Sequence, residues 1–440
     1  MVVPTILTEE TARDFLSVHG HPFPLHEQRH SNRQQGEKWL EVCSLPGKGR
    51  GFVATQRIPA GATVHTSEPL AAVVSQEWIP ETCAWCFHFT YPKRMRYKID
   101  TTIPKNLNNI NNTNKKKKKQ QHTYTTVTIK DVLFCSEPCR HKFQTYGHVK
   151  NESELLLRCY YALEQEYNLR QKQNQDDDNN DIDSNGLITD LQQELDQLDI
   201  NSDEQLSKWI DQAWITFTQQ GLVKAQQWIP DDAEQTMMRL VACCVTRRQI
   251  ESEYLFADQL MVIPKFNDLL NVQCNELAYI RRTIIDNNNN ENKRIIPDEL
   301  IQVMEMFKFF VSATSSFLNC PHIVFRAVYF REMANSFGLW EMSPQQHQNN
   351  NDGNVTDDLE LLGWGIYPSA VYFNHACNAN VRKIRDGRKM VFIAKRDIEE
   401  GEEACISYGC VEDTVEERRK RLLEHYHFLC ACNRCEQESA

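Results

Sequence analysis

The chain has 440 residues, a formal net charge of −11 and a hydrophobic fraction of 41%. This length exceeds the needs of one small core and suits several units packed together. The acidic balance argues against a surface built mainly to hold nucleic-acid phosphates, so we expect a protein substrate that carries basic residues and no direct nucleic-acid binding. No apolar run is long enough for a membrane span, and Met1–Glu10 lacks a secretory pattern. We therefore expect a monomer of the nucleus or cytoplasm without a membrane partner, in which the cysteines are reduced or bind metal.

Residues 38–80 open the folded part with two alternating segments that read as strands. They flank the turn Pro46–Gly51, which contains three glycines. Glycine has no Cβ, so the backbone amides of such a turn can approach a ligand closely. Taken alone, the stretch is more simply a glycine-rich hairpin.

Two cysteine pairs follow in residues 81–150. They are Cys83-Ala-Trp-Cys86 and Cys135-Ser-Glu-Pro-Cys139. Thiolates at such spacing can reach one ion together, and two pairs complete a tetrahedral zinc shell. We prefer this interpretation to four unrelated buried thiols. The Asn-rich insertion Asn106–Gln121, with a run of five lysines, lies between the pairs and is typical of a solvated loop rather than of a nucleic-acid patch.

Residues 151–320 have apolar positions at helical spacing, which predicts a helical block. The segments with this spacing are Glu152–Arg170, Leu206–Gln227, Asp232–Ser252 and Pro297–Thr314. Polar tracts interrupt the chain at Gln173–Asp183, Asn287–Asn292 and Gln345–Asn354. Because each tract lies between periodic segments, we interpret them as insertions at loop tips and not as domain boundaries.

Short motifs follow one another in the last quarter of the chain. They are Asn335-Ser336-Phe337, Asn374-His375-Ala-Cys377-Asn-Ala-Asn380, Ile406-Ser-Tyr408 and Phe428-Leu-Cys430-Ala-Cys432-Asn-Arg-Cys435. Singly each is weak, since an Asn after a helix is most often a cap and a strand Tyr is most often core. In this order they resemble the catalytic half of the SET-domain lysine methyltransferases, most closely the SMYD branch, which joins a SET domain to a MYND zinc finger.

The resemblance implies an α+β fold. Its β-core would consist of residues 38–80 and 321–410, closed by a threaded C-terminal loop. A partial MYND-like finger with its low-complexity insertion would occupy 81–150, a helical insertion 151–320, and a post-SET zinc segment 411–440. Threading is rare in folds, so Asn-His and a later Tyr in this order are specific.

The resemblance also implies S-adenosylmethionine as cofactor and assigns residues to it. The expected contacts are Lys48, Gly49, Asn335, Ser336, Asn374, His375 and Phe428, with Phe337 and Tyr408 lining the channel for the substrate lysine. Tyr408 is the expected catalytic residue. Methyl transfer to an amine is an in-line displacement, for which alignment and exclusion of water matter most. Desolvation and the sulfonium charge favour the neutral amine that the reaction needs.

Two zinc ions are expected. A complete MYND finger holds two, but this chain keeps only the pairs at Cys83/Cys86 and Cys135/Cys139, and its last pair is reduced to His141 or His148. We therefore expect one ion in the finger. The tail supplies Cys430, Cys432 and Cys435, and the resemblance supplies Cys377 as the fourth ligand of a second ion.

The leading hypothesis is an S-adenosylmethionine-dependent protein-lysine N-methyltransferase that acts on a histone or another protein, with chromatin proteins among its partners. One alternative is a catalytically weak or inactive adaptor that binds protein partners. The motif Asn-His-Ala-Cys-Asn-Ala-Asn departs from the usual Asn-His-Ser-Cys-x-Pro-Asn, which leaves room for weakened activity. A thiol hydrolase using Cys377 and His375 is disfavoured, because a zinc-bound thiolate is no free nucleophile.

Overall fold

The computed structural model describes residues 39–104, 124–145, 151–176, 185–220, 228–253, 263–286, 294–342, 359–426 and 428–439. The lysine run, His148, the tract Asn287–Asn292 and the tract Gln345–Asn354 lie outside the described residues, as does most of Gln173–Asp183. Within the described part, helices and strands are both present in segregated groups, and the expected α+β class is confirmed.

The glycine-rich turn joins β1 (Leu40–Leu45) to β2 (Gly49–Ala54) in an antiparallel hairpin. Gly47 and Gly49 have φ angles of 71° and 73°, in the left-handed region that glycine tolerates best. The backbone amide of Lys48 bonds to the carbonyl of Leu45 at 3.1 Å and tightens the turn. The hairpin therefore presents this turn at the end of two strands.

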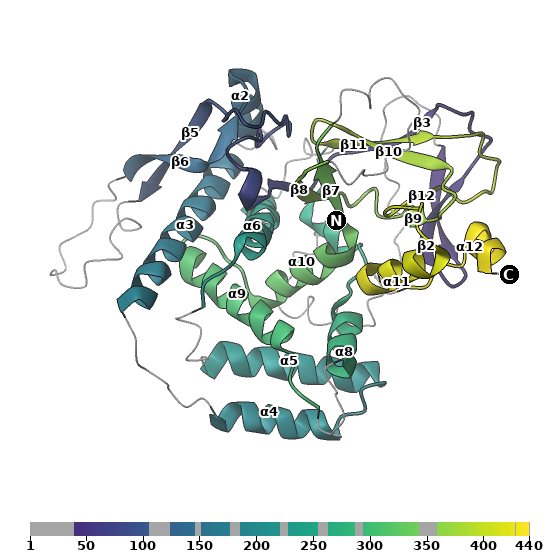
Figure 1. The fold of residues 1–440 in the computed structure, drawn as a ribbon. Coiled ribbons are helices and arrows are strands. Elements are labelled where there is room, and N and C mark those ends of the chain that lie inside the picture. The colour runs from purple at the N-terminus through teal and green to yellow at the C-terminus, as the bar shows by residue number, and fades with distance from the viewer. Residues whose placement is uncertain are drawn as a thin grey trace.

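Two three-stranded sheets are built from strands at opposite ends of the chain (Figure 1). One has the order β4-β8-β7, and the other β10-β11-β3. Their bounds are Ala71–Val74 (β4), Leu361–Ile366 (β8), Ser336–Trp340 (β7), Val381–Asp386 (β10), Lys389–Ala394 (β11) and Thr63–Ser67 (β3). Gly363 allows the close approach of β8 to β4, since a Cβ there would lie 2.0 Å from the Val73 carbonyl oxygen.

A short parallel pair closes this β-core. It joins β9 (Asn374–His375) to β12 (Cys405–Ile406). Phe52 of β2 donates its amide to the Tyr372 carbonyl at 2.9 Å and accepts the Ala404 amide at 2.8 Å. The segment before β12 is thus bonded to β2 as well as β9, so the C-terminal loop runs between two other parts of the core.

The finger contains a hairpin that the sequence did not predict. It consists of β5 (Tyr97–Pro104) and β6 (Tyr124–Phe134), preceded by the short helix η1 (Gln76–Trp78) and followed by α2 (Glu137–Thr145). The register pairs Pro104 with Tyr124, so the insertion that separates the cysteine pairs joins the ends of these strands. The insertion itself lies outside the described residues, so its expected place at a loop tip stays a prediction.

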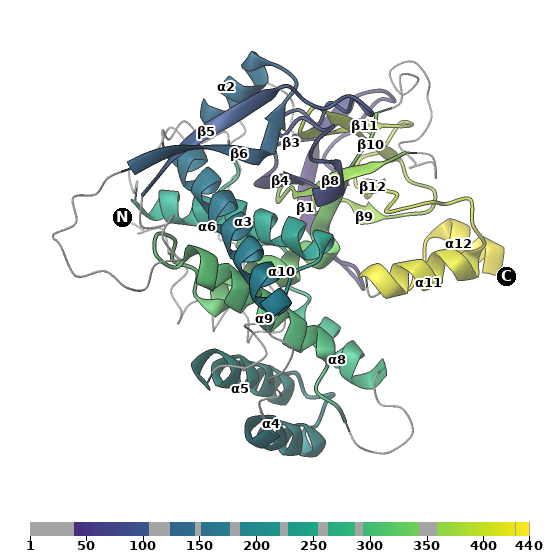
Figure 2. The same ribbon diagram turned by 60° about the vertical axis from the view of Figure 1, so that its left-hand side comes forward.

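Helices fill the side of the molecule opposite the β-core (Figure 2). They are α3 (Glu152–Asp176), α4 (Asn185–Gln197), α5 (Asp203–Gln220), α6 (Asp232–Glu253), α7 (Phe266–Leu270), α8 (Glu276–Asp286), α9 (Asp298–Thr314) and α10 (His322–Asn335). Four of them, α3, α5, α6 and α9, match the segments expected from helical spacing. The buried side chains of Trp214 and Phe310, both 0% exposed, belong to the core that joins these helices. No described helix is long and apolar enough to cross a membrane.

The chain ends in α11 (Val415–Tyr426) and α12 (Asn433–Ser439). Both views place this pair beside β9 and β12, away from α4 and α5 (Figures 1 and 2). The tail therefore lies against the part of the core where the loop is threaded.

Candidate functional site

The four cysteines expected at the tail lie together. Cys377 is 3.4 Å from Cys435 and 3.9 Å from Cys430, measured between sulfur atoms. With Cys432 they form a group whose sulfurs all lie within 4.8 Å of one another. In a tetrahedral zinc site with Zn–S bonds of about 2.3 Å, the sulfurs are roughly 3.8 Å apart. The spacing and the chemistry of the donors therefore fit a four-thiolate metal site.

A buried guanidinium accompanies this group. Arg418 of α11 is 1% exposed, and its Nη2 lies 3.5 Å from the Cys435 sulfur. The same side chain donates to the Asp413 carbonyl and pairs with Glu438. Four thiolates around a divalent ion leave a net negative charge, which a neighbouring guanidinium offsets while it orients the sulfur. Arg418 was not predicted, because nothing in its basic helix distinguishes it from its neighbours.

The finger cysteines form the second such group. Cys135 lies 3.7 Å from Cys86 and 3.5 Å from Cys139, and Cys83 completes the set within 4.8 Å. The loop that carries Cys83 and Cys86 is tightened by two backbone bonds of 2.9 Å, from Cys83 to His88 and from Phe87 to Cys83. His141 is exposed and is not part of the group. The structure thus gathers the four finger cysteines that the spacing predicts, and the four tail cysteines that the spacing and the resemblance predict together.

Tyr408 lies beside His375 of the Asn-His pair. Its backbone amide donates to His375 Nδ1 at 3.1 Å, and its hydroxyl donates to the Phe373 carbonyl at 2.9 Å. The rings of Tyr408 and His375 lie 5.4 Å apart between centroids. Burial raises the pKa of the Tyr408 phenol above its ordinary value, so the phenol stays neutral and can donate.

Two aromatic side chains from the tail lie close to Tyr408. Tyr426, at the end of α11, lies 4.7 Å from Tyr408 between ring centroids. Phe428 lies 6.4 Å from Tyr408 and 6.3 Å from His375. Phe428 was predicted, whereas Tyr426 was missed, because its place at the end of an ordinary helix gives no local signal. The segment that carries the tail cysteines thus places two rings beside Tyr408 and His375.

The glycine-rich hairpin contacts Asn374 both directly and through the Glu403 carboxylate. Asn374 donates its amide to the Arg50 carbonyl at 3.2 Å and to Glu403 Oε1 at 2.9 Å. Lys48 pairs with Glu403 Oε2 at 2.6 Å. Gly51 makes this approach possible, since a Cβ there would lie 2.6 Å from Asn374 Nδ2. Glu403 was also missed, because its role depends on contacts with residues far away in the chain.

Asn335 and Ser336 lie where α10 passes into β7. The Asn335 side-chain amide donates to the Arg331 carbonyl of its own helix at 2.7 Å, which is a capping bond. It also donates to the Gln273 carbonyl at 3.1 Å. Arg50 donates to the Asn271 carbonyl in the same turn. The turn between α7 and α8 is therefore bonded both to Asn335 and to the glycine-rich hairpin.

Phe337 packs among other aromatic side chains. Its ring is 5.5 Å from Tyr367 and 6.2 Å from Phe392 between centroids. Phe392 stacks on Phe373 at 4.3 Å, and the Phe373 carbonyl accepts the Tyr408 hydroxyl. Phe337 thus belongs to a buried aromatic cluster, which we call the aromatic wall, and Tyr408 packs against the same cluster.

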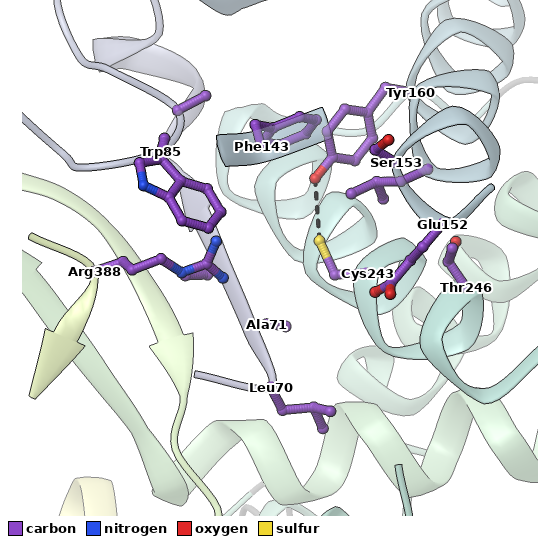
Figure 3. A pocket seen from close by; sticks show the side chains of 13 residues that line it. Leu70, Ala71, Trp85, Phe143, Glu152, Ser153, Tyr160, Cys243, Thr246 and Arg388 are labelled. Carbon is purple, nitrogen blue, oxygen red and sulfur yellow. Dashed lines mark hydrogen bonds between the residues drawn. The ribbon is translucent and has the colours of Figure 1, made fainter. Parts of the chain in front are cut away.

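A separate cavity of about 40 Å³ lies between the finger, β4, α3, α6 and the turn after β10. Figure 3 shows Trp85 and Arg388 on one side and Tyr160 with Cys243 on the other. Arg388 lies over the Trp85 ring at 4.4 Å, and the Tyr160 hydroxyl is 3.2 Å from the Cys243 sulfur. A space of this size suits a few water molecules, and none of the predicted site residues lines it.

Comparison with known proteins agrees with this geometry. A family model described as "SET domain" matches residues 49–409. "Potential protein lysine methyltransferase SET6" of Saccharomyces cerevisiae is 27% identical, over 91% of this chain and 95% of its own length. Human "Histone-lysine N-methyltransferase SMYD3" is 41% identical over 18% of this chain and 19% of its own. "SET domain and MYND-type zinc finger protein 6" of Schizosaccharomyces pombe is 36% identical over 19% of this chain and 17% of its own. The resemblance drawn from the motifs is confirmed.

Proposed function

We propose that this chain, which belongs to the SET domain family, transfers a methyl group from S-adenosylmethionine to a lysine side chain of a protein. The observation that carries the proposal is the position of Tyr408, bonded to His375 and Phe373 and flanked by Tyr426 and Phe428. Histone and non-histone substrates both fit this chemistry.

The residues around Asn374 fit the polar end of the cofactor. Asn374 uses its amide hydrogens on Arg50 and Glu403, so its side-chain oxygen remains as an acceptor for an ammonium group. Lys48 and Glu403 supply one charge of each sign beside it. Phe428, next to the tail cysteines, offers a ring face for the adenine, and Asn335 and Ser336 approach from the end of α10.

S-adenosylmethionine supplies an electrophilic methyl group on a sulfonium. The protein's part is to bring a neutral lysine amine into line with that methyl group and to keep water away. Phe337, Tyr408 and Tyr426 would wall the channel in which the lysine loses its hydration. Desolvation there would favour the uncharged form of the lysine amine, whose free lone pair methyl transfer requires. Tyr408 donates to a carbonyl, which holds its oxygen in a fixed place beside the reacting amine.

We propose zinc for both cysteine groups, since four thiolates in a tetrahedral arrangement are typical of structural zinc. The tail ion would fix α11 and α12 against the threaded loop, because Cys377 follows His375 by two residues. Metal binding and assembly of the channel would then be linked. Ala376, where relatives carry serine, donates its amide to the Ile406 carbonyl at 3.0 Å, a bond that any residue except proline could form.

The test combines binding and turnover. Calorimetric titration with S-adenosylmethionine should show one saturable site per chain, and a lysine-peptide library should gain methyl groups from labelled cofactor. Tyr408→Phe should bind the cofactor within a few-fold of the wild type but lose at least about tenfold in turnover, the loss expected for one positioned hydroxyl. Cofactor binding with no methylation of peptides or cell extract would favour the adaptor. Absence of binding would exclude the proposal.

A further inference from the structure

The β10–β11 hairpin is basic in an otherwise acidic protein. Residues 381–390 contain five basic side chains and one acidic one. Three of the basic groups have structural partners: Arg385 donates to the carbonyls of Trp340 and Phe87, Arg388 lies over Trp85, and Lys389 pairs with Glu68. The remaining two, Arg382 and Lys383, lie on opposite faces of β10 because side chains alternate along a strand.

Lys383 stands on the face of β10 that the aromatic wall covers. It pairs across the strands with Phe392, and its Nζ lies over the Phe337 ring at 5.5 Å. Phe392 stacks on the Phe373 ring, and the Phe373 backbone carbonyl accepts a hydrogen bond from the Tyr408 hydroxyl. β10 is the edge strand of its sheet, so Lys383 lies on the border of this wall rather than at its centre.

The ammonium group of Lys383 has no carboxylate partner within the described part of the chain. Within the described part of the chain, its partner is the Phe337 ring, and no carboxylate lies within 4.0 Å of it. Burial lowers the pKa of this lysine to about 8, so most of the side chains remain charged at neutral pH. A ring contact replaces only part of the hydration that the half-buried ammonium has lost. A carboxylate brought by a ligand would supply the missing partner.

We propose that Lys383 recognises an acidic side chain next to the target lysine, so that the preferred substrate segment carries Asp or Glu close to the lysine that is methylated. This inference rests on the proposed function, because it places the substrate lysine in a channel beside Phe337 and Tyr408. The positive charge would also disfavour substrates whose flanking residues are basic.

Substitutions that change the charge of the enzyme or of the peptide test the inference. The probes are short peptides with a central lysine, in which each flanking position in turn carries Glu or Gln. For the wild type, kcat/KM should be at least about tenfold higher for Glu than for Gln at one or two positions, which corresponds to about 1.4 kcal/mol. Lys383→Gln should abolish this ratio, and Lys383→Glu should invert it. Arg382→Glu, the same charge change on the opposite face of β10, should leave the ratio unchanged.

A binding measurement tests the preference for acidic peptides independently of methyl transfer. Fluorescence anisotropy of labelled Glu and Gln peptides, with S-adenosylhomocysteine present, reports the preference without turnover. If the wild type methylates nothing, the proposed function fails, and the anisotropy ratio still decides the role of Lys383. Equal binding and turnover of the Glu and Gln peptides by the wild type would overturn the inference. So would a preference for Glu that persists in a folded Lys383→Glu variant.

Discussion

Gly51→Ala would test how tightly the glycine-rich hairpin packs against Asn374. Gly51 has no unusual backbone angle, so the substitution acts through space alone. The added Cβ would lie 2.4 Å from Leu45 Cδ1, 2.6 Å from Asn374 Nδ2 and 3.2 Å from Glu403 Oε1. Leu45 can turn away, but Asn374 is held by bonds to Arg50 and Glu403. Overpacking of this kind costs about 1 to 3 kcal/mol in stability.

The expected effect on the cofactor is larger than that on the fold. Displacing the Asn374 amide moves the acceptor that we assign to the cofactor's ammonium group, so the Kd for S-adenosylmethionine should rise at least about tenfold. Gly47→Ala is the matched control: nothing lies within 4 Å of its added Cβ, and only its φ of 71° resists the change. That variant should lose about 1 kcal/mol of stability and keep its affinity. A folded Gly51→Ala protein with unchanged cofactor affinity would refute the reasoning.

Two further predictions concern the metals and a buried carboxyl group. Cys435→Ser and Cys139→Ser should each lower the bound zinc by one equivalent in elemental analysis. Only Cys435→Ser should expose the tail to protease and weaken cofactor binding, and the same effect in both variants would contradict separate roles. Burial raises the pKa of Glu332, which contacts Ser336, from 4.5 to about 7. The folded state therefore binds more protons than the unfolded chain between these values, and stability falls as pH rises through them, by at most about 3 kcal/mol. Glu332→Gln should raise the calorimetric unfolding temperature more near pH 8 than near pH 5, and an equal gain at both would show that this reading of Glu332 is wrong.

The sequence predicted residues whose chemistry depends on spacing within the chain. Cysteine pairs a few residues apart can reach one ion whatever surrounds them, so spacing alone predicted the finger group and the three tail cysteines. Cys377, distant in the chain, was predicted only through the resemblance. Pro46–Gly51 was predicted as a turn because it contains three glycines within six residues. Asn374 and Tyr408 were found through the order of their motifs.

Contacts between distant segments were not predictable in this way. Arg418, Glu403 and Tyr426 belong to segments whose local pattern is that of an ordinary helix or turn, and their roles arise only when the tail folds onto β9 and β12. The β5–β6 hairpin was hidden because a long polar insertion separates its strands. Helices α4 and α8 were also missed, since each is short and adjoins a polar tract.

The central claim is that Asn374, Tyr408 and Phe428 surround one methyl donor while a metal ion holds the tail in place. A crystal structure of the complex with S-adenosylhomocysteine, with anomalous data at the zinc edge, tests this most directly. The account predicts the ligand between Asn374 and Phe428, with its sulfur directed at Tyr408, and an anomalous peak among Cys377, Cys430, Cys432 and Cys435. A ligand bound elsewhere, or cysteines without a metal peak, would contradict it.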